Sequence, residues 1–388
     1  MRILFLCGSL EPGRDGVGDY LRLLAESCLA QGHECRAIAL NDHALTEPVE
    51  ISEPMAGTKL TLLRLPPTLS WPKRIKLATA FRTQFQPDWI SFQFVSYGMQ
   101  EKGIVAKLVP HFQALLAGAR THIMFHELWV GMSPGAPLKH IPIGAWQRWS
   151  IRKLCTAVNP QLVTTSNPLY IAALRRIGVV SSLLPLCGNI TIVDRGSKAD
   201  FPGWLGDLGI TQANRSEWLL GIFFGSLHPE WKPEPFMRIL KSAAKKTGKR
   251  VCLLSLGRLG AVGRDIWEKL KNDYPDISLP VLGEQPAEVV SIIMQTADFG
   301  VAASPWDLIG KSGSAAAMVE HGLPVIVTRA ERQSRFAVSE PPTADPLFHR
   351  CDSALEAKLI AGLPKRTPHA RREEIAARFC MLLKATTG

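Results

Sequence analysis

The sequence predicts an α/β protein built from two consecutive doubly wound domains. Short apolar segments of strand length alternate with longer segments of helical periodicity, which is the pattern of a parallel sheet covered by helices on both faces. The alternation breaks once, at residues 194–216, where glycine, aspartate and Pro202 indicate a linker. A length of 388 residues exceeds one comfortable core and suits two domains.

The domain boundaries follow from this pattern. We expect an N-terminal domain at 1–193, a linker at 194–216, a C-terminal domain at 217–370, and a final helical segment at 371–388 that packs back on the N-terminal domain. In the first domain the expected strands are 2–8, 35–40, 61–65, 88–94, 121–126 and 161–165, and the expected helices are 17–31, 103–119, 144–156 and 168–177. In the second domain the expected strands are 218–224, 250–256, 279–282, 298–303 and 324–328, and the expected helices are 233–247, 263–272, 286–296 and 312–321.

The composition indicates a soluble protein of a reducing compartment. The eight cysteines are scattered, without a C-x-x-C pair or a zinc-type cluster, so we expect a cytoplasmic chain with no metal. The apolar opening segment is too short for a signal peptide and is followed directly by a glycine-rich turn, which favours a buried strand. No apolar run is long enough to span a membrane.

The formal net charge of +11 raises the question of an anionic partner. The basic residues are spread along the chain and no nucleic-acid recognition motif is present, so we expect no nucleic-acid partner. An anionic small ligand or an acidic membrane surface explains the charge as well. The segment 71–82 has the composition of a basic amphipathic helix, which would either lie on a membrane or present a solvated face.

A glycine-rich turn lies between the first strand and the first helix, in the run Gly13-Arg14-Asp15-Gly16-Val17-Gly18-Asp19-Tyr20. Glycines let the backbone approach a ligand closely, and a helix N-terminus offers N–H groups and partial positive charge to an anion. The turn is not G-x-G-x-x-G, so the dinucleotide fingerprint is absent. An anion site and a plain strand-to-helix turn both explain these residues.

Polar side chains also end two further strands of the first domain. His126 ends the strand 121–126, with Glu127 and Trp129 just beyond it, and Gln93 stands near the end of 88–94. Ligands of open parallel sheets bind at the carboxyl ends of the strands, where a histidine can hydrogen-bond a sugar hydroxyl. Ordinary packing explains the same positions.

The second domain carries two cationic turns. Ser226 and Lys232 follow its first strand, and Lys311-Ser312-Gly313-Ser314 lies between a strand and a helix of small residues. Lysine, serines, glycine and a helix N-terminus together form an anion cradle. The triplet Gly310-Lys311-Ser312 is not a Walker A motif, because Pro305 replaces its first glycine.

The order of these motifs resembles that of GT-B glycosyltransferases, especially the retaining family 4 type. The resemblance rests on the opening strand with G-x-G-D-Y, the helix ending Gln31-Gly32-His33-Glu34, the strand-end His126, and Gly322-Leu323-Pro324-Val325-Ile326. It covers almost the whole chain. The resemblance implies two Rossmann-like doubly wound domains facing across a cleft that holds a nucleoside-diphosphate sugar.

The resemblance also assigns roles to residues. It places Gly16 against the donor diphosphate, His126 on the sugar and Lys232 on the diphosphate, while Ser226 replaces the family's arginine. The family's two glutamates fall on Ile309 and Ala317, which are not acidic. Asp307 and Glu320 stand two and three residues away and are the candidate substitutes.

The expected function is therefore transfer of a sugar from a nucleoside-diphosphate donor to a hydroxyl acceptor, which would be a glycan, a glycolipid or a small molecule. Retention of configuration, independence of metal and other cofactors, and a cytoplasmic place with peripheral contact on the inner membrane face are expected with it. The expected catalytic residues are His126 and Asp307. The expected donor-binding residues are Gly16, Val17, Gly18, Ser226, Lys232, Lys311, Ser312, Gly313, Ser314 and Glu320. The expected acceptor-side residues are Asp19, Tyr20, Gln93, Glu127 and Trp129. The missing acidic pair supports an alternative, a non-catalytic GT-B-fold protein that binds a nucleotide or a partner enzyme.

Overall fold

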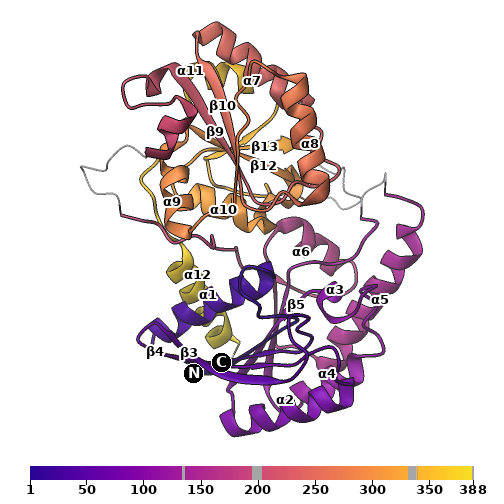
Figure 1. Ribbon diagram of the computed structural model, residues 1–388. Coiled ribbons are helices and arrows are strands. Elements are labelled where there is room, and N and C mark those ends of the chain that lie inside the picture. Colours follow the sequence, from indigo (N-terminus) through magenta and orange to yellow (C-terminus); the bar gives the residue numbers. More distant parts are fainter. Residues whose placement is uncertain (133–135, 195–202, 331–337, 339, 387–388) are drawn as a thin grey trace. The chain divides into compact units, whose positions relative to one another are not determined.

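The computed structural model of the chain describes residues 1–132, 136–194, 203–330, 338 and 340–386. It divides into two compact units (Figure 1). The first contains mainly residues 1–186 and the C-terminal segment from Arg372, and the second contains mainly residues 187–332 and 342–371. Each unit is described by itself.

The first unit is built on a mostly parallel sheet, whose strand order within the described residues is β3-β4-β2-β1-β5-β6-β7-β8. Its strands are β1 (Arg2–Cys7), β2 (Glu34–Ala39), β3 (Val49–Met55), β4 (Thr58–Arg64), β5 (Trp89–Phe94), β6 (Arg120–Phe125), β7 (Leu162–Thr165) and β8 (Ser182–Leu183). Its helices are α1 (Gly16–Ala30), α2 (Trp71–Phe85), α3 (Ser96–Met99), α4 (Val109–Leu116), α5 (His140–Val158), α6 (Pro168–Arg175) and α12 (Arg372–Ala385). Only the β3–β4 pair is antiparallel among the ladders of this sheet that the structure describes.

The second unit has a fully parallel sheet in the order β11-β10-β9-β12-β13-β14. Its strands are β9 (Trp218–Phe224), β10 (Arg250–Leu256), β11 (Val281–Gly283), β12 (Phe299–Pro305), β13 (Val325–Arg329) and β14 (Phe348–Arg350). Its α-helices are α7 (Glu234–Thr247), α8 (Gly260–Asp273), α9 (Ala287–Thr296), α10 (Gly313–Glu320) and α11 (Leu355–Ala361). The described part of this unit also forms the 3₁₀ turns η1 (Gly203–Leu208), η2 (Arg215–Glu217) and η3 (Trp306–Lys311).

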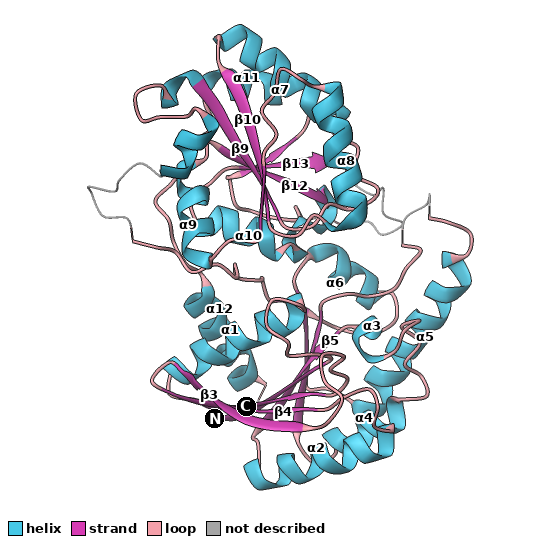
Figure 2. Ribbon diagram, viewed as in Figure 1, coloured by secondary structure: helices cyan, strands magenta, loops and turns pink. Residues whose placement is uncertain are grey.

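Both faces of the second sheet are covered by helices (Figure 2). Along β9, Leu220 and Ile222 belong to the hydrophobic cluster that includes α9 and α10, whereas Leu219 and Phe223 belong to the cluster that includes α7 and α8. Successive strand residues point to opposite faces, so a sheet buried on both sides needs a nearly continuous apolar strand. This requirement explains the sequence WLLGIFF of β9.

The C-terminal helix α12 packs on α1 of the first unit. The Sγ atoms of Cys28 and Cys380 are 3.8 Å apart, and the ring centroids of Phe5 and Phe379 are 6.0 Å apart.

Burial raises the pKa of the Cys155 thiol in α5 to about 12. None of the helices in the described part of the chain is long and apolar enough to cross a membrane.

The sequence predicted a linker at 194–216, but the part of this segment from residue 203 is folded. Residues 195–202 lie outside the described residues, but Leu205 and Ile210 are fully buried in the core of the second unit. The polar composition of this segment gave no indication that Leu205 and Ile210 would be buried. The segment from Gly203 onward therefore belongs to the second unit and is not a spacer.

Several elements differ from the sequence expectation. The sequence did not predict β3, β8, β14, α3 and α11. The helix expected at 103–119 begins only at Val109, because Gly103 has a positive φ of 65° and Pro110 favours the first helical turn. The basic segment 71–82 is helical, but its apolar residues Ile75 and Phe81 are buried in the unit.

Candidate functional site

The turn after β1 packs tightly against the start of α1. A Cβ atom on Gly18 would lie 2.4 Å from the Ser9 carbonyl oxygen, so only glycine fits there. The side chain of Asp15 caps the helix and accepts hydrogen bonds from the N–H groups of Val17 and Gly18, at 2.8 and 2.9 Å. A donor phosphate would have to displace the Asp15 carboxylate to reach these two amides. The anion contact expected at Val17 and Gly18 is therefore not supported by the geometry.

Buried ionic groups stabilise the same turn. Asp42 is fully buried and accepts hydrogen bonds from Ser9 Oγ at 2.9 Å, Leu10 N at 3.1 Å and Arg64 Nε at 2.7 Å. Burial alone raises the pKa of Asp42, but the hydrogen bonds from Arg64, Leu10 and Ser9 outweigh it and hold the pKa below the usual value. Asp19, expected on the acceptor side, instead accepts a hydrogen bond from Gly13 N at 2.9 Å and tightens the turn.

His126 lies at the carboxyl end of β6 and is 7% exposed. Its Nε2 is 2.8 Å from Oε1 of Gln93, and the ring of Tyr20 meets it edge-on with centroids 5.3 Å apart. The Gln93 oxygen can only accept, so Nε2 of His126 carries the proton. The structure thus brings together three of the residues that the sequence singled out, one each from α1, β5 and β6.

The hydrogen bonds continue from Gln93 into the sheet. Gln93 Nε2 donates to Ser91 Oγ at 2.8 Å, Ser91 Oγ is 2.9 Å from His122 Nδ1, and His122 Nε2 is 2.8 Å from Thr164 Oγ1. Burial, with a smaller effect of the nearby His126, lowers the pKa of His122 to about 3. A neutral imidazole in mid-sheet therefore supports the glutamine that orients His126. The sequence pattern did not reveal this chain of side chains, which links β5, β6 and β7.

The remaining acceptor-side expectations have different outcomes. Trp129 is 8% exposed and packs next to Gly144 of α5, so its ring belongs to the core. Glu127 is partly exposed at the end of β6, beside His126. Of these two side chains, only that of Glu127 is partly exposed.

In the second unit, two glycine turns meet at the carboxyl edge of the sheet. Gly225 and Gly257 both have positive φ, of 103° and 85°, and a Cβ on Gly257 would lie 3.6 Å from Gly225 Cα. A Cβ on Gly225 would lie 3.9 Å from the side chain of Ser314, at the start of α10. The turn carrying Ser226 and the N-terminus of α10 are therefore neighbours.

The start of α10 is a capped helix N-terminus. Ser312 Oγ accepts a hydrogen bond from Ala315 N at 3.3 Å and lies 3.2 Å from Ser314 Oγ. Gly313 has no atom within 4 Å of the place a Cβ would take, so the backbone is open to an approaching group. Lys311, the last residue of η3, is half-buried beside this turn.

Lys232 is exposed and is positioned by the residue before it. Trp231 is buried and donates from Nε1 to Thr328 Oγ1 at 2.8 Å, which ties the loop after β9 to the end of β13. Arg329 then binds Glu230 at 2.8 Å across the same loop. These contacts hold Lys232 at the carboxyl edge.

Sequence reasoning missed three further cations at this edge, Arg258, Arg329 and Arg350. The parallel register pairs Leu256 with Phe224, and Arg258 and Ser226 each follow two residues later at this edge. Arg258 Nε forms an ion pair with Glu284 at 2.8 Å. Arg350 ends β14 and lies over the Trp306 ring at 4.9 Å. The missed signal is that each arginine lies within two residues of the end of a strand. Among the described residues, the cations at this edge include Lys232, Arg258, Lys311, Arg329 and Arg350.

Glu320 does not lie at the phosphate end of α10. It is the last residue of the helix, six residues or about 9 Å beyond Ser314 at the usual rise per residue. It is 3% exposed and its Oε1 accepts a hydrogen bond from Gly188 N at 2.9 Å. This arrangement explains its burial as a structural contact and gives no support to the expected donor contact. Asp307 is half-buried in η3, at the carboxyl edge.

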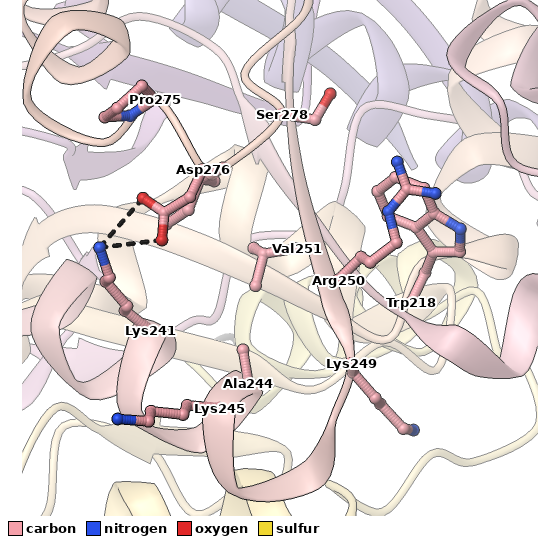
Figure 3. Close-up of a pocket in the computed structure, with 11 residues that line it drawn as sticks. Trp218, Lys241, Ala244, Lys245, Lys249, Arg250, Val251, Pro275, Asp276 and Ser278 are labelled. Atoms are coloured by element: carbon pink, nitrogen blue, oxygen red, sulfur yellow. Dashed lines mark hydrogen bonds and ion pairs between the residues drawn. The ribbon is translucent and has the colours of Figure 1, made fainter.

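A cavity of the second unit lies away from these turns. It has a volume of about 520 Å³ and is lined by Trp218 and Arg250, the first residues of β9 and β10, with Lys241, Lys245 and Lys249 (Figure 3). Lys241 pairs with Asp276 at 2.8 Å, and Arg250 covers the Trp218 ring at 4.0 Å. This is the amino edge of the sheet, opposite the glycine turns, so it is not the candidate donor site. The described residues contain no group of three or more His, Cys, Asp or Glu side chains that could hold a metal ion.

With this geometry described, comparison with known proteins defines the fold. No protein-family model matches the chain, and no curated protein sequence matches it. HepE of Anabaena, solved with UDP and glucose, is similar at 14% identity over 99% of this chain and 100% of its own, with a TM-score of 0.54.

Two further solved structures are similar to the chain over its length. A UDP-forming trehalose-phosphate synthase of Burkholderia xenovorans, solved with glucose-6-phosphate, gives 12% identity, full coverage of both chains and a TM-score of 0.58. WaaG, a glycosyltransferase of lipopolysaccharide biosynthesis, gives 12% identity, coverage of 99% of this chain and 98% of its own, and a TM-score of 0.55. The chain has the fold of these proteins, two Rossmann-like domains of the GT-B type, as the sequence predicted.

Proposed function

We propose that the chain is a glycosyltransferase that moves a sugar from a nucleoside-diphosphate sugar to a hydroxyl acceptor. The observation that carries this proposal is the gathering of cations around two glycine turns and the start of α10, at the carboxyl edge of the second sheet. Glycines allow a phosphate to approach the backbone, and cations with helix N–H groups neutralise it. HepE, similar in fold, was solved with UDP and glucose, so UDP-glucose is the first donor to test.

The proposed division of work places the leaving diphosphate on the second unit. Lys232 and Lys311 supply charge, and Ser226, Ser312, Gly313 and Ser314 supply hydroxyl and amide donors. Arg258 would take the place of the family's arginine, because it and Ser226 each follow the paired strands β10 and β9 by two residues. A leaving group that develops negative charge is stabilised most by donors already fixed in place. These cations would replace a metal ion, so we propose a metal-independent reaction.

The sugar-side role is proposed for the first unit and for Asp307. His126, held by Gln93 with Nε2 protonated, would contact the sugar, and Glu127 would face the acceptor. The transition state of such transfer resembles an oxocarbenium ion, which a nearby carboxylate such as Asp307 stabilises. Retention of configuration belongs to this proposal. The proposal also includes Gly16, which would let the donor approach the backbone closely, and Tyr20, which packs on His126.

The proposed setting is the cytoplasm, with peripheral contact on the inner membrane face. The acceptor would be a glycan, a glycolipid or a smaller hydroxyl compound, and no nucleic acid takes part. A solved neighbour, WaaB, is a lipopolysaccharide outer core galactosyltransferase, and it covers the whole chain at 11% identity. Its acceptor class is the first to test with UDP-sugars.

The test is a donor panel followed by release of nucleoside diphosphate, with Lys311→Ala as the control. Release with one donor, strongly reduced in the variant, is the expected result. The second candidate function is a non-catalytic GT-B-fold protein that binds a nucleotide or a partner enzyme. It is favoured by the apolar, buried side chains of Ile309 and Ala317 where the family has glutamates. Thermal stabilisation by a nucleotide without any turnover would favour this second function.

A further inference from the structure

Helix α5 of the first unit carries large apolar side chains on its exposed face. A helix on the surface of a soluble domain usually buries its apolar stripe and exposes polar residues. In α5 the exposed side chains include Ile141, Trp146 and Trp149, at 47%, 61% and 50% exposure. Its buried positions are Gly144, Gln147, Ser150, Ile151 and Leu154. The inner face buries apolar side chains only near its C-terminal end, and the aromatic rings stand on the outer face.

This orientation is fixed by the inner face. Gln147 is fully buried; its Oε1 accepts from Val130 N at 3.0 Å, and its Nε2 donates to Tyr97 Oη at 2.8 Å and to the Lys102 carbonyl at 2.9 Å. A Cβ atom on Gly144 would lie 2.0 Å from the Val130 carbonyl oxygen. The helix cannot rotate to bury its tryptophans without breaking three hydrogen bonds and a glycine contact. The exposed rings are a property of the folded unit.

Basic residues predominate in the sequence on both sides of this helix. Residues 101–194 contain nine lysines and arginines and three acidic residues, Glu101, Glu127 and Asp194, a difference of +6 within a chain total of +11. Arg148, Arg152 and Lys153 are exposed on the same side of α5 as the tryptophans, and Lys153 Nζ lies 5.3 Å from the Trp149 ring centroid. The helix itself has no acidic residue.

We propose that this surface, the α5 face formed by Ile141, Trp146, Arg148, Trp149, Arg152 and Lys153, binds the surface of a bilayer that contains anionic phospholipid. Tryptophan prefers the boundary between headgroups and acyl chains, and cations are attracted to anionic headgroups. A helix with both features lies in the plane of the interface. Tryptophan and arginine are also common in protein–protein interfaces, but here three cations stand on a helix without an acidic residue, which favours an anionic surface over a second copy of the same face.

The expected basic helix α2 does not offer such a surface. Its Ile75 and Phe81 are buried, and Arg74 is 5% exposed and donates to carbonyl oxygens inside the unit. The α5 face is therefore the membrane-binding surface among these two basic helices. This inference does not depend on the proposed transferase activity, because it uses no residue of the donor site.

The test is co-sedimentation of the full chain with vesicles of phosphatidylcholine alone or with phosphatidylglycerol added. We expect binding only to the anionic vesicles, weakened by high salt. The variant Arg148→Gln/Arg152→Gln/Lys153→Gln should bind about a hundredfold more weakly, since each cation near an anionic surface contributes about fivefold. The variant Trp146→Gln/Trp149→Gln should lose vesicle binding and the quenching of tryptophan fluorescence by brominated lipid.

Two control variants remove equal features elsewhere. Lys241→Gln/Lys245→Gln/Lys246→Gln removes three exposed cations from α7, and Val262→Gln/Met381→Gln removes two exposed apolar side chains. Both should bind like the wild type. Absence of wild-type binding to anionic vesicles, or unchanged binding of both α5 variants, overturns the proposal. So does a dimer in solution that the tryptophan variant abolishes, because the α5 face then binds a second copy. Nucleotide-diphosphate release in solution, measured in parallel, reports on the transferase activity separately.

Discussion

The buried imidazole of His122 gives the N-terminal unit a pH-dependent stability that can be measured. His122 is fully buried between Ser91 and Thr164, and burial lowers its pKa from 6.5 to about 3. In the unfolded chain the same histidine titrates near 6.5. The unfolded state therefore binds the proton more tightly than the folded state. Stability is complete above about pH 6.5 and is lost as the pH falls from there toward 3.

The size of the loss follows from the two pKa values. Each pH unit between them corresponds to about 1.4 kcal/mol. From pH 7 to pH 4.5, His122 alone should lower the free energy of unfolding by about 2.5 kcal/mol. Other groups also titrate in this range, so the effect must be isolated with a variant that removes only this titration. His122→Gln keeps a polar group beside Ser91 but cannot be protonated.

The assay is urea unfolding at pH 7 and pH 4.5, with hydrogen exchange of the β6 amides to assign the transition to the N-terminal unit. His122→Gln should be less stable than the wild type at pH 7, because one hydrogen bond is lost. Its further loss on acidification should be smaller than that of the wild type by about 2.5 kcal/mol. The exposed His43→Gln serves as the control and should follow the wild type. Equal losses in wild type and His122→Gln would refute a neutral, buried His122.

Four other predictions concern the site and its supports. Lys311→Ala should lower kcat/KM with the identified donor by about 2–3 kcal/mol of transition-state stabilisation, while an apo melt shows a stability change within about 0.5 kcal/mol; unchanged kinetics would show that the phosphate site is misplaced. Arg258→Ala should lower kcat/KM by about tenfold or more, and Ser226→Arg in that background should restore part of the loss; no recovery would mean that the two positions do not share the phosphate. Asp42→Asn should lower the free energy of unfolding by about 3 kcal/mol in chemical denaturation, because Arg64 keeps only Glu11 as an ionic partner. EDTA should leave turnover intact, and a strict requirement for added Mn²⁺ or Mg²⁺ in the same assay would contradict metal independence.

The fold was predictable because the central strands are buried on both faces. Segments such as WLLGIFF in β9 are apolar throughout and can only be central strands of a covered sheet. The edge strand β3 was missed because its residues are at most half-buried and Pro54 interrupts the pattern. Its signal was the positive-φ turn Ala56-Gly57, which joins β3 to β4 as a hairpin. The burial of Leu205 and Ile210 was not predicted, because two apolar residues in a polar segment do not give a helical or strand periodicity.

Parts of the candidate site that depend on a short local motif could be predicted from the sequence. Parts that depend on the register between distant strands could not. Ser312 caps α10 within three residues, so its position could be inferred from the sequence. Arg258 and Ser226 come to the same edge of the sheet only through the parallel pairing of β9 and β10, which links positions 32 residues apart. Asp15 occupies the amides of Val17 and Gly18, which composition alone did not indicate. The pairing of His126 with Gln93 likewise depends on the register of β5 and β6.

The structure explains why Ile309 and Ala317 are apolar where the GT-B family has glutamates. This explanation bears on the choice between an enzyme and a binding protein. Ile309 and Ala317 are at most 1% exposed and belong to one hydrophobic cluster. A Cβ on Gly188 would lie 2.6 Å from Ala317 Cα, so the backbone of the entering segment covers this part of α10 and leaves no room for a longer side chain. In the proposed enzyme, carboxylate contacts to sugar and ribose would then come from other elements, and Asp307 is a half-buried acid on the segment that precedes α10. The cations, by contrast, stand on turns that the strands fix and need no help from these positions. Diphosphate binding is therefore common to both functions, and turnover that depends on Asp307 is the property that belongs to the enzyme alone.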